Sequence, residues 1–257
     1  MRRVICPLPD RDFDVTEVSV PWRLLTDAGI EVVFATESGE TPAADPLLLS
    51  GVIFGQLGAD PEPKQFYEQM STDERFTSPL AWSTLSSFDD FDGLLLPGGH
   101  AQGMRQYLAS EQLQRHVASF WRTEKPVAAI CHGVLVLARS VDPESGRSIL
   151  HGARTTCLPK YMERSAYWLT AWKLGRYYRT YPAYVQDEVK EALEDAKAQF
   201  VRGPIHLMAR GSRTDHRAAF VVEDGRYVSG RWPGDAYLLA ERFIERLHGA
   251  AHTETPE

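Results

Sequence analysis

Cysteine is scarce in this chain of 257 residues, which carries it only at Cys6, Cys131 and Cys157. No two of these cysteines have CxxC spacing, and an odd number of thiols cannot pair completely. A disulfide framework is therefore not expected. A reducing compartment, the cytoplasm, is the predicted location.

Long hydrophobic runs and an excess of basic residues are also missing. The longest apolar stretch, "VAAICHGVLVLA", is too short to span a bilayer, and the first residues, "MRRVICPLPD", lack the apolar length of a signal peptide. The formal net charge is −7 and the pI is about 5.7, so the chain has no general attraction to phosphate backbones or anionic lipids. We expect neither nucleic acid nor a membrane as a partner.

What the sequence does contain is an alternation of apolar strands and amphipathic helices. The segments "RRVICPL" and "IEVVFAT" predict short buried strands on either side of a helix in "VTEVSVPWRLLTDAG". The pattern resumes at "FDDFDGLLLPGG" and ends with the helix "DAYLLAERFIERLHG". We predict a single α/β domain over residues 1–248, doubly wound, with a mostly parallel sheet sandwiched by helices.

Two segments interrupt this alternation. Residues 41–90 contain several prolines, residues 160–203 are rich in aromatic side chains, and both are longer than simple connections. We predict that both are insertions, that they form helical caps, and that they lie together over the Cys131 edge of the sheet. Residues 249–257 are expected to be a flexible tail.

The stretch "VAAICHGV" is the most informative motif. Ala129 and Gly133 lie two residues on either side of Cys131, which is the spacing of a nucleophile elbow with cysteine in place of serine. Such a turn lifts Cys131 towards the ligand-binding edge of an α/β sheet, and the amides at the helix start favour its thiolate. The alternative is that Cys131 is a small core hydrophobe. His132 pairs with Cys131 only if the elbow is strained; otherwise it closes the pocket wall.

A second turn at the end of a strand is predicted in "LLLPGGHAQGM". Consecutive glycines allow backbone N–H groups to approach a ligand closely. We assign the amides of Gly99 and His132 as the donors of an oxyanion hole, and we place Gly98 and His100 in the substrate pocket. The alternative is an ordinary glycine turn before a helix.

Four segments, "DVTEVSVPWRLLTDAGIEVVFAT", "FDGLLLPGGHA", "KPVAAICHGV" and "GARTTCLPKYME", resemble the ThiJ/PfpI superfamily, and within it the heat-shock glyoxalase III and chaperone branch. The resemblance implies the fold of class I glutamine amidotransferases. It also implies that Glu17 faces the thiol of Cys131 and that Glu163 orients His132. Two alternatives stay open: Glu17 has capping-box separation from Asp14, and Glu163 could be a solvated residue on a helix face.

The chain also departs from these relatives. The segment "VSGRWPGDA" places Trp232 and Arg231 at the expected rim of the site, where relatives often have a Gly-Gln-Asn-Pro-like turn. Some bacterial relatives bind zinc through two histidines and a carboxylate, but only His100 has a counterpart, so we expect no metal and no other cofactor. The late His-x-Glu pair of true glutaminases is missing, which disfavours amidotransfer. Relatives commonly dimerise and the aromatic insertion is strongly apolar, so a homodimer is expected.

Three functions remain open. The resemblance implies a cofactor-independent enzyme in which Cys131 attacks a small electrophilic substrate, most directly a glyoxalase III-like conversion of methylglyoxal to a hydroxy acid. The same pocket could instead hydrate an isonitrile or hydrolyse an amide, because crowding by Tyr161, Trp168, Trp172 and Trp232 suits a larger apolar substrate. A third possibility, from another class, is a non-enzymatic oxidative-stress sensor or holding chaperone whose thiol is oxidised to a sulfinate.

Overall fold

A seven-stranded sheet runs through the computed structural model, which describes residues 1–51, 58–205 and 208–249. The strand order is β5-β3-β1-β6-β7-β9-β8. All neighbours are parallel except β8 and β9, which form an antiparallel hairpin. The predicted α/β class with a mostly parallel sheet is confirmed. The strands are β1 (Arg3–Pro7), β3 (Glu31–Thr36), β5 (Leu80–Ala81), β6 (Gly93–Leu96), β7 (Val127–Ile130), β8 (Val221–Asp224) and β9 (Tyr227–Gly230).

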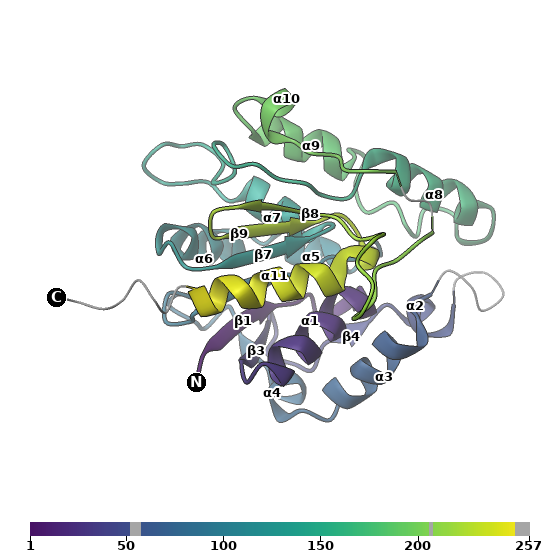
Figure 1. The fold of residues 1–257 in the computed structure, drawn as a ribbon, viewed down its shortest axis with the longest axis horizontal. Helices are drawn as coiled ribbons and strands as arrows, with labels where there is room; N and C mark the ends of the chain where they lie inside the picture. The colour runs from purple at the N-terminus through teal and green to yellow at the C-terminus, as the bar shows by residue number, and fades with distance from the viewer. Residues whose placement is uncertain (52–57, 206–207, 250–257) are drawn as a thin grey trace.

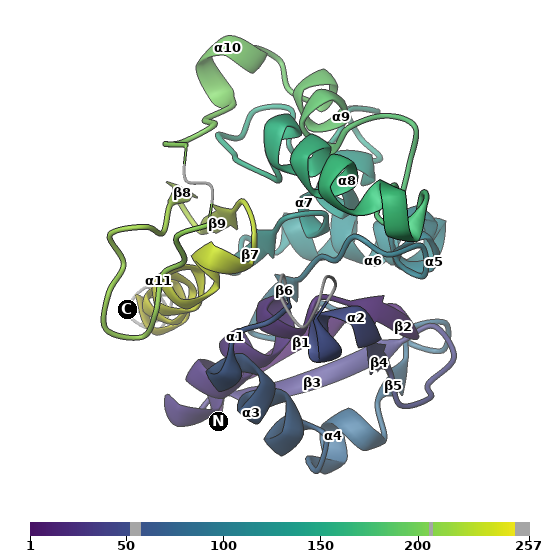
Figure 2. The same ribbon diagram turned by 90° about the vertical axis from the view of Figure 1, so that its right-hand side faces the viewer.

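Helices cover both faces of this sheet (Figures 1 and 2). On one face, α1 (Val15–Asp27) packs against α11 (Ala236–Gly249), with α3 (Pro61–Met70) outside α1. The other face is covered by α5, α6 and α7, which span Met104–Ala109, Glu111–Arg122 and Gly133–Arg139. Strands from both halves of the chain share the sheet, so we keep the proposal of one domain over residues 1–248.

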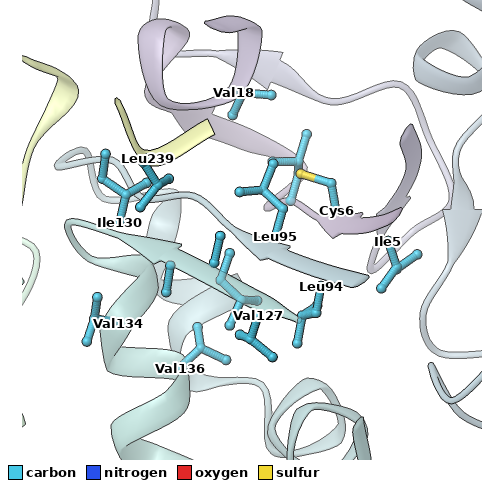
Figure 3. Close-up of a cluster of buried hydrophobic side chains, with 14 of the residues drawn as sticks. Ile5, Cys6, Val18, Leu94, Leu95, Val127, Ile130, Val134, Val136 and Leu239 are labelled. Carbon is cyan, nitrogen blue, oxygen red and sulfur yellow. The ribbon is translucent and has the colours of Figure 1, made fainter. Parts of the chain in front are cut away.

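Alternate residues of the central strands fill the two sides of the core, as the period of a strand requires. In Figure 3, Cys6 and Leu95 lie on the side of Val18 in α1, whereas Leu94 and Val127 lie on the side of α7. All five side chains are fully buried. The carboxyl ends of β6 and β7 are therefore held by packing on both faces of the sheet.

The segment 41–90 is built into the sandwich more deeply than an inserted cap would be. Its strand β5 extends the main sheet beside β3, and its helix α3 packs on α1. Its strand β4 (Ala43–Ala44) pairs with β2 (Arg11–Phe13) in a separate two-stranded sheet. The short helices α2 (Pro46–Ser50) and α4 (Glu74–Thr77) complete the segment, of which residues 52–57 lie outside the described residues.

The segment 160–203 is helical, as predicted. It contains α8 (Lys160–Leu174), α9 (Val185–Ala192) and α10 (Ala196–Gln199), which Figure 1 shows as one group away from α1 and α3. The two interrupting segments meet at Asp45, whose carboxylate accepts hydrogen bonds from Tyr177 and Tyr178, both at 3.1 Å.

The last helix, α11, closes the described part of the chain. The 3₁₀ turn η1 (Pro233–Asp235) leads into α11, which ends at Gly249, and the rest of the predicted tail, 250–257, lies outside the described residues. Within the described ranges, no helix has the length and apolar character needed to cross a membrane.

Candidate active site

Cys131 stands at the sharp turn between β7 and α7. Strand β7 ends at Ile130 and α7 begins at Gly133, so Cys131 and His132 form the whole connection. Cys131 has a φ of 58°, in the left-handed region where a side chain is strained by roughly 1–3 kcal/mol. Its amide donates a hydrogen bond to the Gly230 carbonyl at 3.1 Å, which fixes the turn to β9. The strained elbow that the motif predicts is present.

Two glycines permit the close approach of the loops around this turn. A Cβ atom on Gly133 would lie 2.0 Å from the Leu96 carbonyl oxygen. A Cβ atom on Gly98 would lie 2.7 Å from the His132 nitrogen and 2.9 Å from Glu17 Oε2. Any larger residue would therefore push the end of β6 away from the elbow or displace the Glu17 carboxyl group.

Glu17 lies in the first turn of α1 and points into the site. The helix is capped by Asp14, whose side chain accepts hydrogen bonds from the amides of Thr16 at 2.8 Å and Glu17 at 3.0 Å. The Glu17 carboxyl group is fully buried, and its Oε2 accepts from the Gly98 amide at 2.8 Å. Its Oε1 has no hydrogen-bond partner that meets normal geometry among the described residues. The capping alternative is therefore wrong for Glu17, because the Asp14 amide donates to the Gly98 carbonyl at 2.9 Å and not to the Glu17 side chain.

Burial controls the charge of both reactive groups. It raises the pKa of Glu17 well above its usual range, and the neighbouring Asp14 charge raises it further against the opposing Gly98 hydrogen bond. Burial likewise raises the pKa of Cys131, and the negative charge of Glu17 raises it further. The hydrogen bond from the His132 backbone N–H lowers it. The expectation that the helix start favours the thiolate is corrected, because desolvation outweighs the amide. Cys131 can ionise readily only while Glu17 holds a proton.

Two histidines complete the polar cluster around the sulfur. His132 is 1% exposed, and its Nδ1 lies 3.5 Å from Cys131 Sγ. The ring of His100 meets that of His132 edge-on, with centroids 4.7 Å apart. Burial lowers the pKa of His132 and lowers that of His100 to about 4, so both imidazoles are neutral near pH 7. The pairing of Cys131 with His132, left open by the sequence, is present at the strained turn.

Glu163 is not placed as the resemblance implies. Its Oε1 accepts from Arg179 Nη1 at 2.9 Å and its Oε2 from the Val185 amide at 3.0 Å. Across the described residues, no hydrogen bond joins it to His132. It is also 2% exposed, so the solvated alternative is wrong too. Burial raises the pKa of Glu163 to about 7, against the Val185 and Arg179 contacts. The carboxylate ties α8 to the start of α9 and does not orient His132.

A cavity of about 400 Å³ opens above the sulfur. His100 and Trp232 line it as predicted, whereas Gly98 and Tyr161 are not among its lining residues. Gly98 lies next to the elbow, where its amide holds Glu17. Both interrupting segments supply walls, as expected. The apolar lining includes Leu48, Ala59, Leu158, Met162, Ala166, Leu169, Met208, Trp232 and Pro233.

Two predictions about the rim of this cavity are wrong. Trp168 and Trp172 do not crowd the pocket, because they are 72% and 69% exposed on α8. Arg231 is completely buried and forms a two-point ion pair with Asp235, at 2.8 and 2.9 Å. The i,i+4 spacing of Arg231 and Asp235 in "RWPGD" was the available signal for this pair.

Arg210 is a lining residue that the sequence did not reveal. Its guanidinium lies 5.6 Å from the Trp232 ring centroid and 3.7 Å from Asp60. It brings a positive charge to a wall that is otherwise mainly apolar. No local pattern distinguishes it from a surface arginine.

The polar groups near the sulfur leave two candidate donors for an oxyanion. The Gly98 amide is occupied by Glu17. Gly99 lines the cavity, and the His132 amide interacts with the Cys131 sulfur. The oxyanion hole at Gly99 and His132 stays a prediction.

Comparison with known proteins shows where a similar architecture occurs. Residues 8–204 match the family described as ThiJ/PfpI family-like. An uncharacterized protein of Schizosaccharomyces pombe is 32% identical over 95% of this chain and 84% of its own length. A glutathione-independent glyoxalase of the same yeast is 25% identical, over 90% of this chain and 87% of its own. The crystal structure of glyoxalase III from Candida albicans has a TM-score of 0.69 at 21% identity, over 95% of this chain and 97% of that chain, a likeness of fold.

Proposed function

The chain belongs to the ThiJ/PfpI-like family, and from this membership and its site we propose a cofactor-independent enzyme that acts on small electrophiles through Cys131. We propose 2-oxoaldehydes such as methylglyoxal as its substrates and 2-hydroxy acids as its products. The observation that carries the proposal is that Cys131, on a strained turn, lies beside a buried Glu17 carboxyl group and the His132 imidazole and lines a cavity of about 400 Å³. The glyoxalase among the relatives supports it.

The first step would join the sulfur to the aldehyde carbon. The Cys131 thiolate attacks that carbon, a C–S bond forms, and the carbonyl oxygen takes a proton to give a hemithioacetal. The neutral His132 imidazole, whose Nδ1 lies 3.5 Å from the sulfur, can take the proton that the thiol loses, and a protonated Glu17 can supply the proton that the carbonyl oxygen gains. The amides of Gly99 and His132 would stabilise the negative charge that develops on the oxygen.

The later steps need a group that removes and returns protons. A base takes the hydrogen of the former aldehyde carbon, and protonation of the adjacent carbon then gives the thioester of a 2-hydroxy acid. Water cleaves the C–S bond and restores the thiol, so one water is added and no electrons leave the substrate. Glu17 or His132 would carry these protons, since His132 Nδ1 lies 3.5 Å from the sulfur and the Glu17 carboxyl group lines the same cavity.

A panel of electrophiles tests this proposal on the wild type and on Cys131→Ala. The panel contains methylglyoxal, phenylglyoxal, an alkyl isonitrile and a simple amide. We expect hydroxy-acid formation from the oxoaldehydes only, its loss in Cys131→Ala, and a lower KM for phenylglyoxal because the apolar cavity of about 400 Å³ exceeds the needs of methylglyoxal. Product is measured by chromatography. Turnover confined to the isonitrile or the amide would replace this reaction with hydration or hydrolysis.

The oxidative-sensor function receives less support from the site. Cys131 is 2% exposed, and its pKa is raised, whereas redox-sensing thiols are accessible and easily ionised. If no electrophile in the panel reacts, a sulfinate at Cys131 after mild peroxide, detected by intact mass, would favour the sensor instead.

We also propose that the chain forms a homodimer. Helix α8 exposes Trp168, Leu169 and Trp172, which are 72%, 53% and 69% accessible. Such a group of large apolar side chains is unusual on a monomer surface. Light scattering at micromolar concentration should give twice the chain mass of 28.9 kDa, and Trp168→Glu should shift the value towards the monomer. A wild-type mass of a single chain would end the proposal.

A further inference from the structure

Three metal-binding side chains converge around the sulfur. One ligand atom from each of His100, Cys131 and His132 lies within 4.8 Å of the other two. They come from the turn after β6 and from the elbow after β7, so both supports are fixed by the core. The zinc ligands considered from the sequence were two histidines and a carboxylate, a different set in which only His100 took part.

His100 carries a ring nitrogen that has no other use in the described structure. His100 Nε2 is buried and has no hydrogen-bond partner among the described residues. Its ring packs edge-on against His132, and the residue lines the cavity together with Cys131. A buried polar atom without a partner is uncommon and calls for an explanation, which an ion in the site would supply.

We propose that His100, Cys131 and His132 form a zinc site, and that a bound Zn²⁺ blocks the Cys131 nucleophile. Zinc prefers nitrogen and sulfur ligands in a tetrahedron, with bonds of about 2.0–2.1 Å to nitrogen and about 2.3 Å to sulfur, which sets ligand atoms roughly 3.5 Å apart. The distance of 3.5 Å from Cys131 Sγ to His132 Nδ1 already matches. The His100 nitrogen lies within 4.8 Å of the other two ligand atoms, and a small rotation of its side chain would bring it to the distance that zinc requires.

The same cavity provides both the entry path and the fourth ligand. Three protein ligands leave one tetrahedral position, which a water molecule from the cavity lined by Cys131 and His100 would occupy. On binding, the S–H bond of Cys131 breaks, an S–Zn bond forms, and the proton leaves to solvent. The sulfur lone pair that would attack an aldehyde is then engaged by the metal. The site is thus inhibitory and does not supply a catalytic ion.

Zinc affinity is the direct test, and it does not depend on any enzymatic activity. Purified chain stripped with chelator is titrated with Zn²⁺ in competition with a chromogenic chelator, and with Co²⁺ in an absorbance experiment. We expect one Zn²⁺ per chain, a thiolate-to-cobalt band that is lost in Cys131→Ser, and an affinity lower by about 10-fold or more in His100→Gln. The matched control is His151→Gln, whose ring contacts Arg147 away from the cavity and which should bind as the wild type does.

A second measurement protects the test against misfolded variants. The rate of Cys131 alkylation by iodoacetamide in the wild type should fall when one equivalent of Zn²⁺ is present, and chelator should restore it. Equal zinc affinity in the wild type and a folded His100→Gln, or alkylation that is indifferent to Zn²⁺, would overturn the proposal.

Discussion

Replacing Cys131 with serine is expected to abolish turnover of 2-oxoaldehydes, with kcat lower by about 10⁴-fold or more. The hydroxyl has nearly the same size and can occupy the strained position at φ 58°. A hydroxyl ionises far less readily than a thiol, and burial opposes ionisation at this position still further. Steady-state production of the hydroxy acid measures the effect.

The matched control for this variant is Cys6→Ala. Cys6 is a fully buried thiol in β1 that lies away from the cavity, so its loss should lower stability and leave kcat unchanged. Cys131→Ser, in turn, should keep the melting temperature of the wild type. Appreciable turnover in a folded Cys131→Ser would mean that another group attacks the substrate.

The parts of this site that the sequence predicts are those with a local cause. The elbow follows from the small residues around Cys131. A Cβ atom at position 133 would lie 2.0 Å from the Leu96 carbonyl oxygen, so only glycine fits there. The parallel sheet follows from strands and helices that alternate along the chain. Each of these depends on residues a few positions apart.

The parts that the sequence missed depend on partners far along the chain. Glu163 and Arg179 lie on different sides of a turn in the cap, and the direction of the Glu163 side chain follows from how α8 and α9 pack. Arg210 reaches the cavity from a segment with no regular structure. Arg231 was assigned to the rim because it stands where relatives have a turn beside the site, and its burial is stabilised by the ion pair with Asp235.

The role of Glu17 lies between these cases. Its spacing from Asp14 indicates a capping box, and only the three-dimensional contact of its Oε2 with the Gly98 amide separates the pocket acid from the cap. The family resemblance correctly implied that Glu17 faces the Cys131 thiol, whereas the local pattern favoured a helix cap. Its chemical role is therefore the part of the site most in need of a direct experiment.

Glu17→Gln is expected to lower kcat by about 10²- to 10⁴-fold, the range that a positioned acid or base contributes. The amide oxygen can still accept from the Gly98 N–H, so the pocket should keep its shape. It has no acidic proton to give to the substrate oxygen. Glu163→Gln is the comparison, because it alters a buried carboxyl group bonded to Arg179 and should lower kcat much less. Full turnover in Glu17→Gln would remove the proton shuttle from the mechanism.

The same substitution should make the folded chain more stable at neutral pH. Because burial raises the pKa of Glu17 above its usual value of 4.5, the folded chain keeps a proton that the unfolded chain releases. The contribution of Glu17 to the free energy of unfolding therefore falls as the pH rises above 4.5. Glutamine has no proton to lose, so the variant does not lose stability in this way. Melting temperatures in chelator-containing buffer should show Glu17→Gln above the wild type at pH 7 and equal to it near pH 4. A glutamine variant that is less active but no more stable at pH 7 would mean that Glu17 is ionised without penalty in the folded site.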